Sequence, residues 1–323
     1  MRLRRLAVAL LIAAQVMGNA PEARAASADG QFSKFPIALN GSYIPIVGAF
    51  DCDDGNDGPP GDFSFEEQGV VLYAPGSAPD YLWTDLGSSG AFTKTQTQLS
   101  INGTYIPVAG DYDGDRCSDI LWYGKGAAPD VMWWGGPSGF TRGRPISITG
   151  TYVPVPGYFG GAGAGIFWYA PNGTERQWLG TGNRNAPFRS VAAPQVSGQA
   201  YRPVTFGNGN HGGGELLFHG PGAIPDSVWR YYPTVNGLVV FERTSVSLTG
   251  SYVPAGCRSQ VVLHEPTSAD KLFTVNMADD YVTYDLAITG SYRVAATGGQ
   301  TRRCLVVWHR PGSASDQIWF SST

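Results

Sequence analysis

A short motif, a glycine followed within three residues by a tyrosine, recurs six times along the 323-residue chain. The spacing between successive motifs runs from 40 residues (Tyr252 to Tyr292) to 62 residues (Tyr43 to Tyr105). Periods of this size are typical of repeat architectures, in which each copy is one supersecondary unit. The six tyrosines are Tyr43, Tyr105, Tyr152, Tyr201, Tyr252 and Tyr292. We therefore expect six similar units arranged as one array.

A second signature follows in every copy: a β-rich run, a turn, an acidic residue, and an aromatic residue three positions later. The acid is expected to fix the turn by bonding local backbone, and the aromatic ring to fill the space between units. Residues present in every repeat usually serve packing, although a carboxylate beside a tryptophan could also hold a sugar. The pairs are Asp80/Trp83, Asp130/Trp133, Glu175/Trp178, Asp226/Trp229, Asp270/Phe273 and Asp316/Trp319.

Each copy is interpreted as four short strands, which in the second copy cover residues 105–110, 120–123, 131–134 and 140–148. The composition agrees, because 44 Gly, 23 Pro and 12% aromatic residues stand beside only 15% charged residues. Such a composition favours many short strands and tight turns. A four-stranded sheet of about 50 residues buries both faces only when neighbours stack radially on it. The predicted fold is all-β: a six-bladed β-propeller of four-stranded blades.

The two ends of the chain predict how the ring closes. The last copy stops after its third strand, at residues 317–320, whereas residues 31–39 precede the first copy. Phe32-Ser33-Lys34 is similar to Phe92-Thr93-Lys94 in a fourth strand. We expect the N-terminal strand to complete the last blade, since an open ring would expose a blade face. The expected blades are residues 40–98, 99–147, 148–195, 196–247, 248–287, and 288–323 with 31–39.

Residues 1–25 have the pattern of a secretory signal peptide. Three arginines precede an apolar run at residues 6–14, and Ala23-Arg24-Ala25 matches a cleavage site. The run is about half as long as a membrane-spanning helix, so we expect no membrane span. Residues 26–323 then form a single secreted, extracellular and monomeric domain. The formal net charge of −4 offers no basic surface for nucleic acid.

Four cysteines are present in this chain, and an exported protein with an even number is expected to form disulfides. Four cysteines allow three pairings. The repeat favours Cys52–Cys117 and Cys257–Cys304, because each pair lies in consecutive copies near the same loop between strands.

The most informative loop is Gly110-Asp111-Tyr112-Asp113-Gly114-Asp115-Arg116-Cys117-Ser118-Asp119. It places carboxylates at relative positions 1, 3, 5 and 9, with room for a backbone carbonyl at position 7. Ca²⁺ prefers six to eight such hard oxygen ligands. Without a cation the four acids would repel one another. A solvated acidic turn is the alternative, and the spacing favours calcium.

The string GDYDGDRCSDILWYGKGAAPDVMWW resembles the FG-GAP/VCBS repeat, found in integrin alpha-chain propellers and in many exported bacterial proteins. The resemblance implies that this loop joins the first two strands of a blade and binds Ca²⁺. The first copy aligns Asp51 and Asp53 with the second and third acids, before an acid-rich insertion, and suggests a distorted second site. By resemblance the ligands are Asp111, Asp113, Asp115 and Asp119, with Cys117 as a backbone ligand.

A further column of residues follows the second strand of each copy: Tyr73, Tyr123, Tyr169, His219, His264 and His309. Three successive histidines could indicate a metal or catalytic site. However, equivalent positions in a propeller form a ring around the axis and need not converge, so we expect a structural column. Paired carboxylates from separate blades stay open as a catalytic arrangement, but the acids outside the metal loops mostly belong to the repeat. We therefore predict no catalytic residues and no enzyme.

Function is therefore predicted as recognition. The leading hypothesis is a calcium-stabilised scaffold that binds an extracellular protein or surface polymer through loops on one face. A lectin with carbohydrate pockets between blades is the alternative, and a hydrolase or lyase acting on extracellular polymers is the least favoured. Trp134, Tyr231 and Tyr232 interrupt the repeat and are candidates for exposed contacts.

Overall fold

The computed structural model describes residues 28–52, 68–87, 90–125, 129–196, 198–207, 214–276, 279–297, 304–312 and 315–321. The expected signal peptide at residues 1–25 lies outside the described residues. Asp53 and the rest of the acid-rich insertion lie outside them as well.

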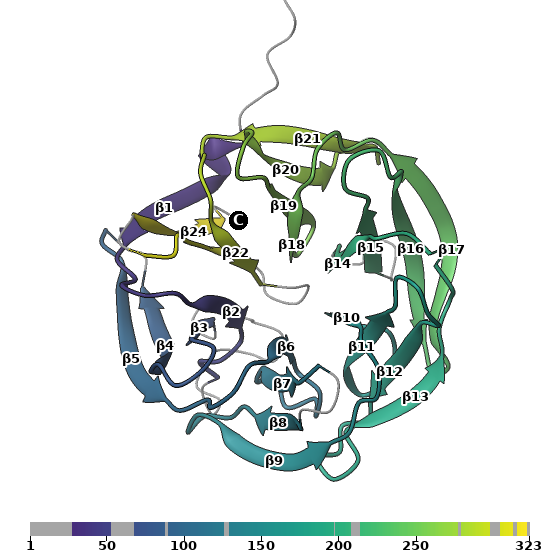
Figure 1. Ribbon diagram of the computed structural model, residues 1–323, viewed down its shortest axis with the longest axis horizontal. Coiled ribbons are helices and arrows are strands. Elements are labelled where there is room, and N and C mark those ends of the chain that lie inside the picture. The colour runs from purple at the N-terminus through teal and green to yellow at the C-terminus, as the bar shows by residue number, and fades with distance from the viewer. Residues whose placement is uncertain are drawn as a thin grey trace, which may run out of the picture.

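Six four-stranded antiparallel sheets surround a central axis (Figure 1). We number these blades 1 to 6. Blade 1 contains β2 (Ile44–Gly48), β3 (Gly69–Tyr73), β4 (Asp80–Gly87) and β5 (Thr93–Leu99). Blade 2 contains β6 (Ile106–Gly110), β7 (Asp119–Tyr123), β8 (Asp130–Trp134) and β9 (Thr141–Ile146). Blade 3 contains β10 (Val153–Gly157), β11 (Gly163–Tyr169), β12 (Arg176–Gly180) and β13 (Phe188–Ala192).

The remaining blades follow the same order. Blade 4 contains β14 (Arg202–Phe206), β15 (Gly214–His219), β16 (Asp226–Thr234) and β17 (Gly237–Val246). Blade 5 contains β18 (Val253–Cys257), β19 (Gln260–His264), β20 (Asp270–Val275) and β21 (Tyr281–Leu286). Blade 6 contains β22 (Arg293–Ala296), β23 (Leu305–His309), β24 (Asp316–Ser321) and β1 (Phe32–Ile37), which a 3₁₀ turn, Asp29–Gln31, precedes.

The ring closes as the sequence predicts, because β1 pairs antiparallel with β24 (Figure 1). The register runs from Phe32 opposite Ser321 to Ile37 opposite Asp316. The expected all-β, six-bladed propeller with an N-terminal closing strand is confirmed. No α-helix occurs in the part of the chain that the structure describes, and no helix there could cross a membrane.

The similarity between the N-terminal strand and β5 has a structural counterpart. Lys34 Nζ lies 4.1 Å from the ring centre of Trp319, and Lys94 Nζ lies 4.1 Å from the ring centre of Trp83. Each lysine of an outer strand thus covers the tryptophan of the neighbouring third strand. The same cation–π contact occurs in blades 1 and 6 because β1 takes the place of a fourth strand.

Burial follows strand position within a blade. The second strands β3, β7 and β23 are buried at every residue, whereas β5 on the rim is exposed at nearly every residue. A strand covered on both faces reads as a continuous apolar run, such as Gly69-Val70-Val71-Leu72-Tyr73. The rim strand β5 is polar because its side chains face solvent.

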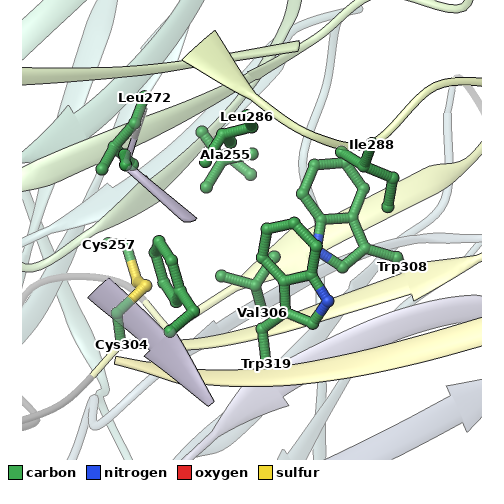
Figure 2. Close-up of a cluster of buried hydrophobic side chains, with 12 residues drawn as sticks. Ala255, Cys257, Leu272, Leu286, Ile288, Cys304, Val306, Trp308 and Trp319 are labelled. Atoms are coloured by element: carbon green, nitrogen blue, oxygen red, sulfur yellow. A yellow bond between two sulfur atoms is a disulfide. The ribbon is translucent and has the colours of Figure 1, made fainter. Parts of the chain in front are cut away.

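In the described part of the chain the hydrophobic core forms six clusters, and each cluster lies between two neighbouring blades. The cluster between blades 5 and 6 joins Leu272 to Trp308 and Trp319 (Figure 2). The centres of the two indole rings are 4.9 Å apart. Because the apolar surface of each blade is buried only against its neighbours, the ring is stable as a whole.

In blades 1, 2, 4 and 6 the acid of the second signature connects the blade to the segment that leaves it. In blade 1, Asp80 accepts hydrogen bonds from the amides of Ala74, 2.8 Å, and Ile101, 2.7 Å. Asp130 and Asp226 make the equivalent pairs of bonds. These side chains are buried, which agrees with the packing role predicted from the repeat rather than a sugar cradle.

Two disulfides, Cys52–Cys117 and Cys257–Cys304, cross between neighbouring blades, as the repeat predicts. The first joins blade 1 to blade 2, and the second joins blade 5 to blade 6 (Figure 2). Their Cα atoms are 5.4 Å apart in both cases, within the range of a disulfide. Each bridge restricts the separation of two blades.

We predict that Asp316→Ala destabilises the ring at its closure. Asp316 accepts hydrogen bonds from Leu39, at 2.7 Å, and from Arg310, at 2.8 Å. The change leaves two amides without their acceptor, and at about 1–3 kcal/mol each it lowers the free energy of unfolding by about 3 kcal/mol. Chemical denaturation measures the change.

The matched control is Asp285→Ala, which removes an acid that is 45% exposed and paired with Lys271. An exposed pair contributes about 0–1 kcal/mol, so this variant should unfold nearly as the unmodified protein does. Equal stability of the two variants would contradict the role assigned to Asp316.

Candidate functional site

A pocket of about 570 Å³ lies between blades 4 and 5. This volume is within the range of small-molecule sites, about 300–1,000 Å³. Its walls come from β16, β17, β20, β21 and the residues that follow β17 or precede β21. The lining residues are Arg230, Glu242, Thr244, Ser245, Val246, Ser247, Leu248, Phe273, Asp279, Asp280, Tyr281 and Thr283.

Arg230 organises the polar side of this pocket. Its Nε donates to Glu215 Oε1 at 3.1 Å, and its Nη1 donates to Glu242 Oε2 at 3.1 Å. Asp279 accepts from Nη1 at 2.9 Å and from Nη2 at 2.7 Å. Burial opposes the charge, but the Asp279 and Glu215 carboxylates outweigh it and raise the pKa of Arg230. The guanidinium is therefore held in place and always charged.

Two aromatic rings from blade 5 form the apolar side. Phe273 and Tyr281 stack with ring centres 5.4 Å apart and planes 7° from parallel. The Tyr281 hydroxyl donates to Glu215 at 2.8 Å and accepts from Arg230 at 3.0 Å. Burial, and then the charge of Glu215, raise the pKa of Tyr281, so this hydroxyl stays protonated. Tyr281 thereby joins the apolar and polar sides.

Strand alternation in β16 places Arg230 at this junction. Successive side chains of a strand point to opposite faces, so Arg230 and Tyr231 face different neighbouring blades. The pairing with β17 also shifts register here, and the extra residue, Phe241, belongs to β17. Arg230 contacts Tyr281 of blade 5, whereas Tyr231 packs on Phe159 of blade 3, with ring centres 5.4 Å apart.

Sequence reasoning did not identify Arg230, although a signal was present. The residue directly after the aromatic of the second signature is uncharged in the five other copies. These residues are Thr84, Trp134, Leu179, Thr274 and Phe320. A single charged residue in an otherwise uncharged column, next to buried strands, would have indicated a specialised position.

The predicted metal loop, residues 110–119, joins β6 to β7, as the resemblance implies. Asp111, Asp113 and Asp115 each place a carboxylate oxygen within 4.8 Å of the others. No other such group of three is found in the described part of the chain. Asp119 lies apart from this group: it is buried and accepts from the amides of Tyr112, 2.8 Å, and Gly135, 2.9 Å. Cys117 donates its amide to Asp115 Oδ1 at 2.9 Å.

An arginine from blade 3 contacts this loop. Arg184, between β12 and β13, forms ion pairs with Asp113 and with Asp115, the latter at 2.8 Å. Its guanidinium also lies 5.7 Å from the centre of the Trp134 ring. One part of the predicted charge repulsion is thus relieved by the protein itself.

The remaining negative charge indicates that the loop fits a cation. Burial, and then the charge of Asp113, raise the pKa of Asp119 to about 8. Burial likewise raises the pKa of Asp111 and the pKa of Asp115. Arg184 pairs with two of the three clustered acids, so negative charge remains that a divalent cation would relieve. Hard oxygens at this spacing are the donor set that Ca²⁺ prefers.

The predicted second metal site is only partly described. Asp51 Oδ2 accepts from the amide of Asp85 at 2.5 Å, and Asp53 lies outside the described residues. The loop of blade 1 is instead attached to the loop of blade 2. Ala49 and Ser118 exchange two hydrogen bonds, of 2.8 and 2.9 Å, beside the Cys52–Cys117 disulfide.

The Tyr/His column connects neighbouring blades. Tyr73 OH accepts from the amide of Tyr105, 2.9 Å, and donates to the carbonyl of Gly103, 2.8 Å. In blade 4, His219 Nε2 accepts from the amide of Tyr252 at 3.0 Å, and its Nδ1 lies 2.7 Å from Asp226. Because Nε2 accepts, the proton is assigned to Nδ1.

The two other histidines of the column repeat this arrangement. His264 joins Asp270 to the amide of Tyr292, and His309 joins Asp316 to the amide of Tyr43. All three histidines are buried, and each bonds a different acid and a different tyrosine. The column is a set of separate contacts between blades, as the sequence predicts, and not one converging site.

Of the three aromatic residues predicted to be exposed, only Tyr232 is exposed. Trp134 and Tyr231 are buried, at 4% and 2% exposure, so the prediction is wrong for them. Trp134 lies under Arg184, and Tyr231 fills the junction with blade 3. Tyr232 is 42% exposed and stacks on Phe241, with ring centres 4.2 Å apart.

No protein-family model matches the sequence, and no curated protein matches it either. Membership of the FG-GAP/VCBS family therefore stays a prediction. Among solved structures, a SapL1 lectin in complex with alpha methyl fucoside is similar in fold, with a TM-score of 0.51. The identity is 11%, and the match covers 91% of this chain and 95% of the lectin chain.

The WD40 repeats of RRP9 give a TM-score of 0.44 at 8% identity. That match covers 92% of this chain and 98% of the RRP9 chain. At these identities the lectin shows the propeller fold alone, and the RRP9 match is too distant to add to it.

We predict that His219→Ala weakens the junction between blades 4 and 5. The change removes the acceptor of the buried Tyr252 amide and leaves a small cavity, so the free energy of unfolding falls by about 3 kcal/mol. Urea denaturation checks this, with Val235→Ala, at a side chain that is 75% exposed, as the control. A variant as stable as the control would show that the histidine is not a structural contact.

Proposed function

We propose that this protein is an exported carbohydrate-recognition propeller whose ligand binds in the pocket between blades 4 and 5. The observation that carries the proposal is the composition of that pocket: a fixed guanidinium, carboxylates, hydroxyl side chains and an aromatic pair around one concavity. Sugars present both hydroxyl groups and apolar ring carbons. Convergent polar groups beside an apolar wall are the features of a small-molecule site.

Binding rather than catalysis is proposed because the buried histidines are already engaged. Each has both ring nitrogens in contacts within the scaffold, so none faces a substrate. The fold agrees with this proposal, since the similar SapL1 lectin was solved with a fucoside. The likeness of fold supports the class of function and transfers no individual residue. Two disulfides favour an oxidising compartment, as expected for an exported chain.

The pocket predicts that Ser245→Trp abolishes saccharide binding. Ser245 is an exposed residue of β17 that lines the pocket, so an indole there fills the cavity without entering the core. Screening on a glycan array identifies binding by the unmodified protein, and titration calorimetry of the best sugar should show at least a tenfold loss in the variant.

Thr95→Trp is the matched control, because Thr95 is an exposed residue of a rim strand in blade 1, remote from the pocket. It should retain the affinity of the unmodified protein. Undiminished binding by the Ser245→Trp variant would place the sugar elsewhere, and an empty array would remove the proposal.

We further propose that Ca²⁺ stabilises the loop of Asp111, Asp113, Asp115 and Asp119, with the Cys117 carbonyl as a backbone ligand. The charge excess of the loop supports this. When bound, the ion would neutralise the clustered carboxylates and fix the connection between β6 and β7. Asp51 and Asp53 remain candidates for a second, distorted site.

Chelation is expected to lower the melting temperature. A ligand bound only to the folded state stabilises it by mass action, by about 2.7 kcal/mol at a hundredfold excess over Kd. Differential scanning calorimetry with EGTA and with added calcium measures the shift. Asp113→Ala should abolish the response to calcium, whereas Asp285→Ala should keep it. A calcium response that survives Asp113→Ala would mean that the ion binds elsewhere.

Recognition of a protein partner is a second candidate, and the hairpin of β16 and β17 favours it. Tyr232, Val235, Val239 and Phe241 of this hairpin are exposed apolar side chains, which are often found at interaction sites. The same Ser245→Trp variant separates the two candidates, because it closes the pocket and leaves these four side chains unchanged.

A further inference from the structure

We propose that the pocket between blades 4 and 5 selects sugars that carry a free, positively charged amino group. This inference rests on the proposed carbohydrate function and specifies its ligand class. Three features of the pocket support it: the excess of carboxylates, the engagement of Arg230, and the separation of the acids from one another.

The charges of the pocket favour a cation. The lining contains one positive residue, Arg230, and three negative ones, Glu242, Asp279 and Asp280, for a formal charge of −2. Glu215 does not line the pocket but contacts Arg230, and counting it brings the formal charge to −3. The Glu242 and Asp279 side chains are 45% and 49% exposed, so a ligand can reach them. A neutral sugar would leave this excess unchanged, whereas an ammonium group would reduce it.

Arg230 does not favour an anionic ligand, although an isolated arginine would. Its Nε, Nη1 and Nη2 atoms all donate to carboxylates within hydrogen-bond distance. A carboxylated or sulfated sugar would have to displace Glu242 or Asp279 and then face the displaced charge. The guanidinium therefore acts as an anchor that fixes the positions of the acids.

The arrangement of the acids favours an organic ligand over a metal ion. Within the described ranges, the Asp111 loop is the one place where three acidic groups bring oxygens within 4.8 Å of one another. The acids of the pocket surround Arg230 and do not converge in this way. Spaced acceptors suit the separate N–H and O–H groups of an amino sugar, which can meet different carboxylates.

The rest of the lining suits the uncharged part of such a sugar. Thr244, Ser245, Ser247 and Thr283 carry hydroxyls that can donate or accept. Tyr281, stacked on the buried Phe273, offers apolar surface for ring carbons. A simple amine would use the acids alone, so binding of the whole sugar should exceed binding of methylamine.

Titration calorimetry with four probes at pH 7 and low salt tests the proposal: glucosamine, N-acetylglucosamine, glucose and methylamine. N-acetylation keeps the ring and removes the charge, so this pair isolates the ammonium group. Glucosamine is expected to bind at least tenfold more tightly than each of the other three. The preference should shrink as salt rises, because the acids are partly exposed.

Charge-neutral variants test where the preference arises. Glu242→Gln and Asp279→Asn keep the side-chain shape, and asparagine tolerates the positive φ of 67° at position 279. Each should reduce glucosamine affinity about tenfold while leaving glucose binding unchanged. Asp285→Asn, at an acid of β21 that does not line the pocket, should change neither affinity. Melting temperatures confirm that all three variants fold.

The outcomes separate this inference from the proposed function. Equal affinity for glucosamine, N-acetylglucosamine and glucose, lost in Ser245→Trp, would overturn the amine preference and leave the carbohydrate site standing. If methylamine binds as tightly as glucosamine, the sugar ring contributes nothing to binding. That result would overturn the proposed ligand class and favour lysine-bearing ligands. A glucosamine preference that survives both neutral variants would also overturn the proposal. Failure of every sugar to bind the unmodified protein would remove both.

Discussion

The buried acid at the start of the third strand is the contact on which the ring depends. In blades 1, 2, 4 and 6 it bonds the turn behind its own strand and the amide of the segment that leaves the blade. For Asp316 that segment is the N-terminal one, so the same contact closes the circle. A carboxylate with two such bonds fixes one blade against the next, and its loss leaves buried amides unpaired.

The Tyr/His column adds a second set of contacts. In it either a tyrosine hydroxyl or a histidine ring accepts a hydrogen bond from a backbone amide of the next blade. A tyrosine hydroxyl can accept from one amide and donate to a carbonyl, as Tyr73 does. A histidine accepts at Nε2 and must orient its other nitrogen, and Asp226 does this for His219. The structural acid thus serves two purposes in blades 4 to 6. Function is then expected where the repeat is interrupted, as Arg230, the one charged residue at its position in the six copies, illustrates.

The fold and its closure could be predicted because both follow from the repeat. Strand positions, the pairing of the N-terminal strand and both disulfides are all consequences of aligning six copies. Pockets between blades were an alternative prediction, but neither the position nor the lining of this one was predicted. Its residues Glu215, Arg230, Asp279 and Tyr281 are distant in sequence and meet only through the packing of two blades. Trp134 and Tyr231 were misjudged for a related reason: a residue that breaks a repeat can pack against another irregularity instead of solvent. Arg184 was missed because it reaches the acidic loop from the next blade.

We propose that Arg230 and the acids around it turn a structural junction between blades 4 and 5 into a binding site. A crystal structure of the protein soaked with glucosamine would show whether it does. We expect electron density for the sugar between Arg230 and Tyr281, with its nitrogen near Glu242 or Asp279. Sugar density at another junction or on the rim, with this pocket filled only by water, would show that the binding site lies elsewhere.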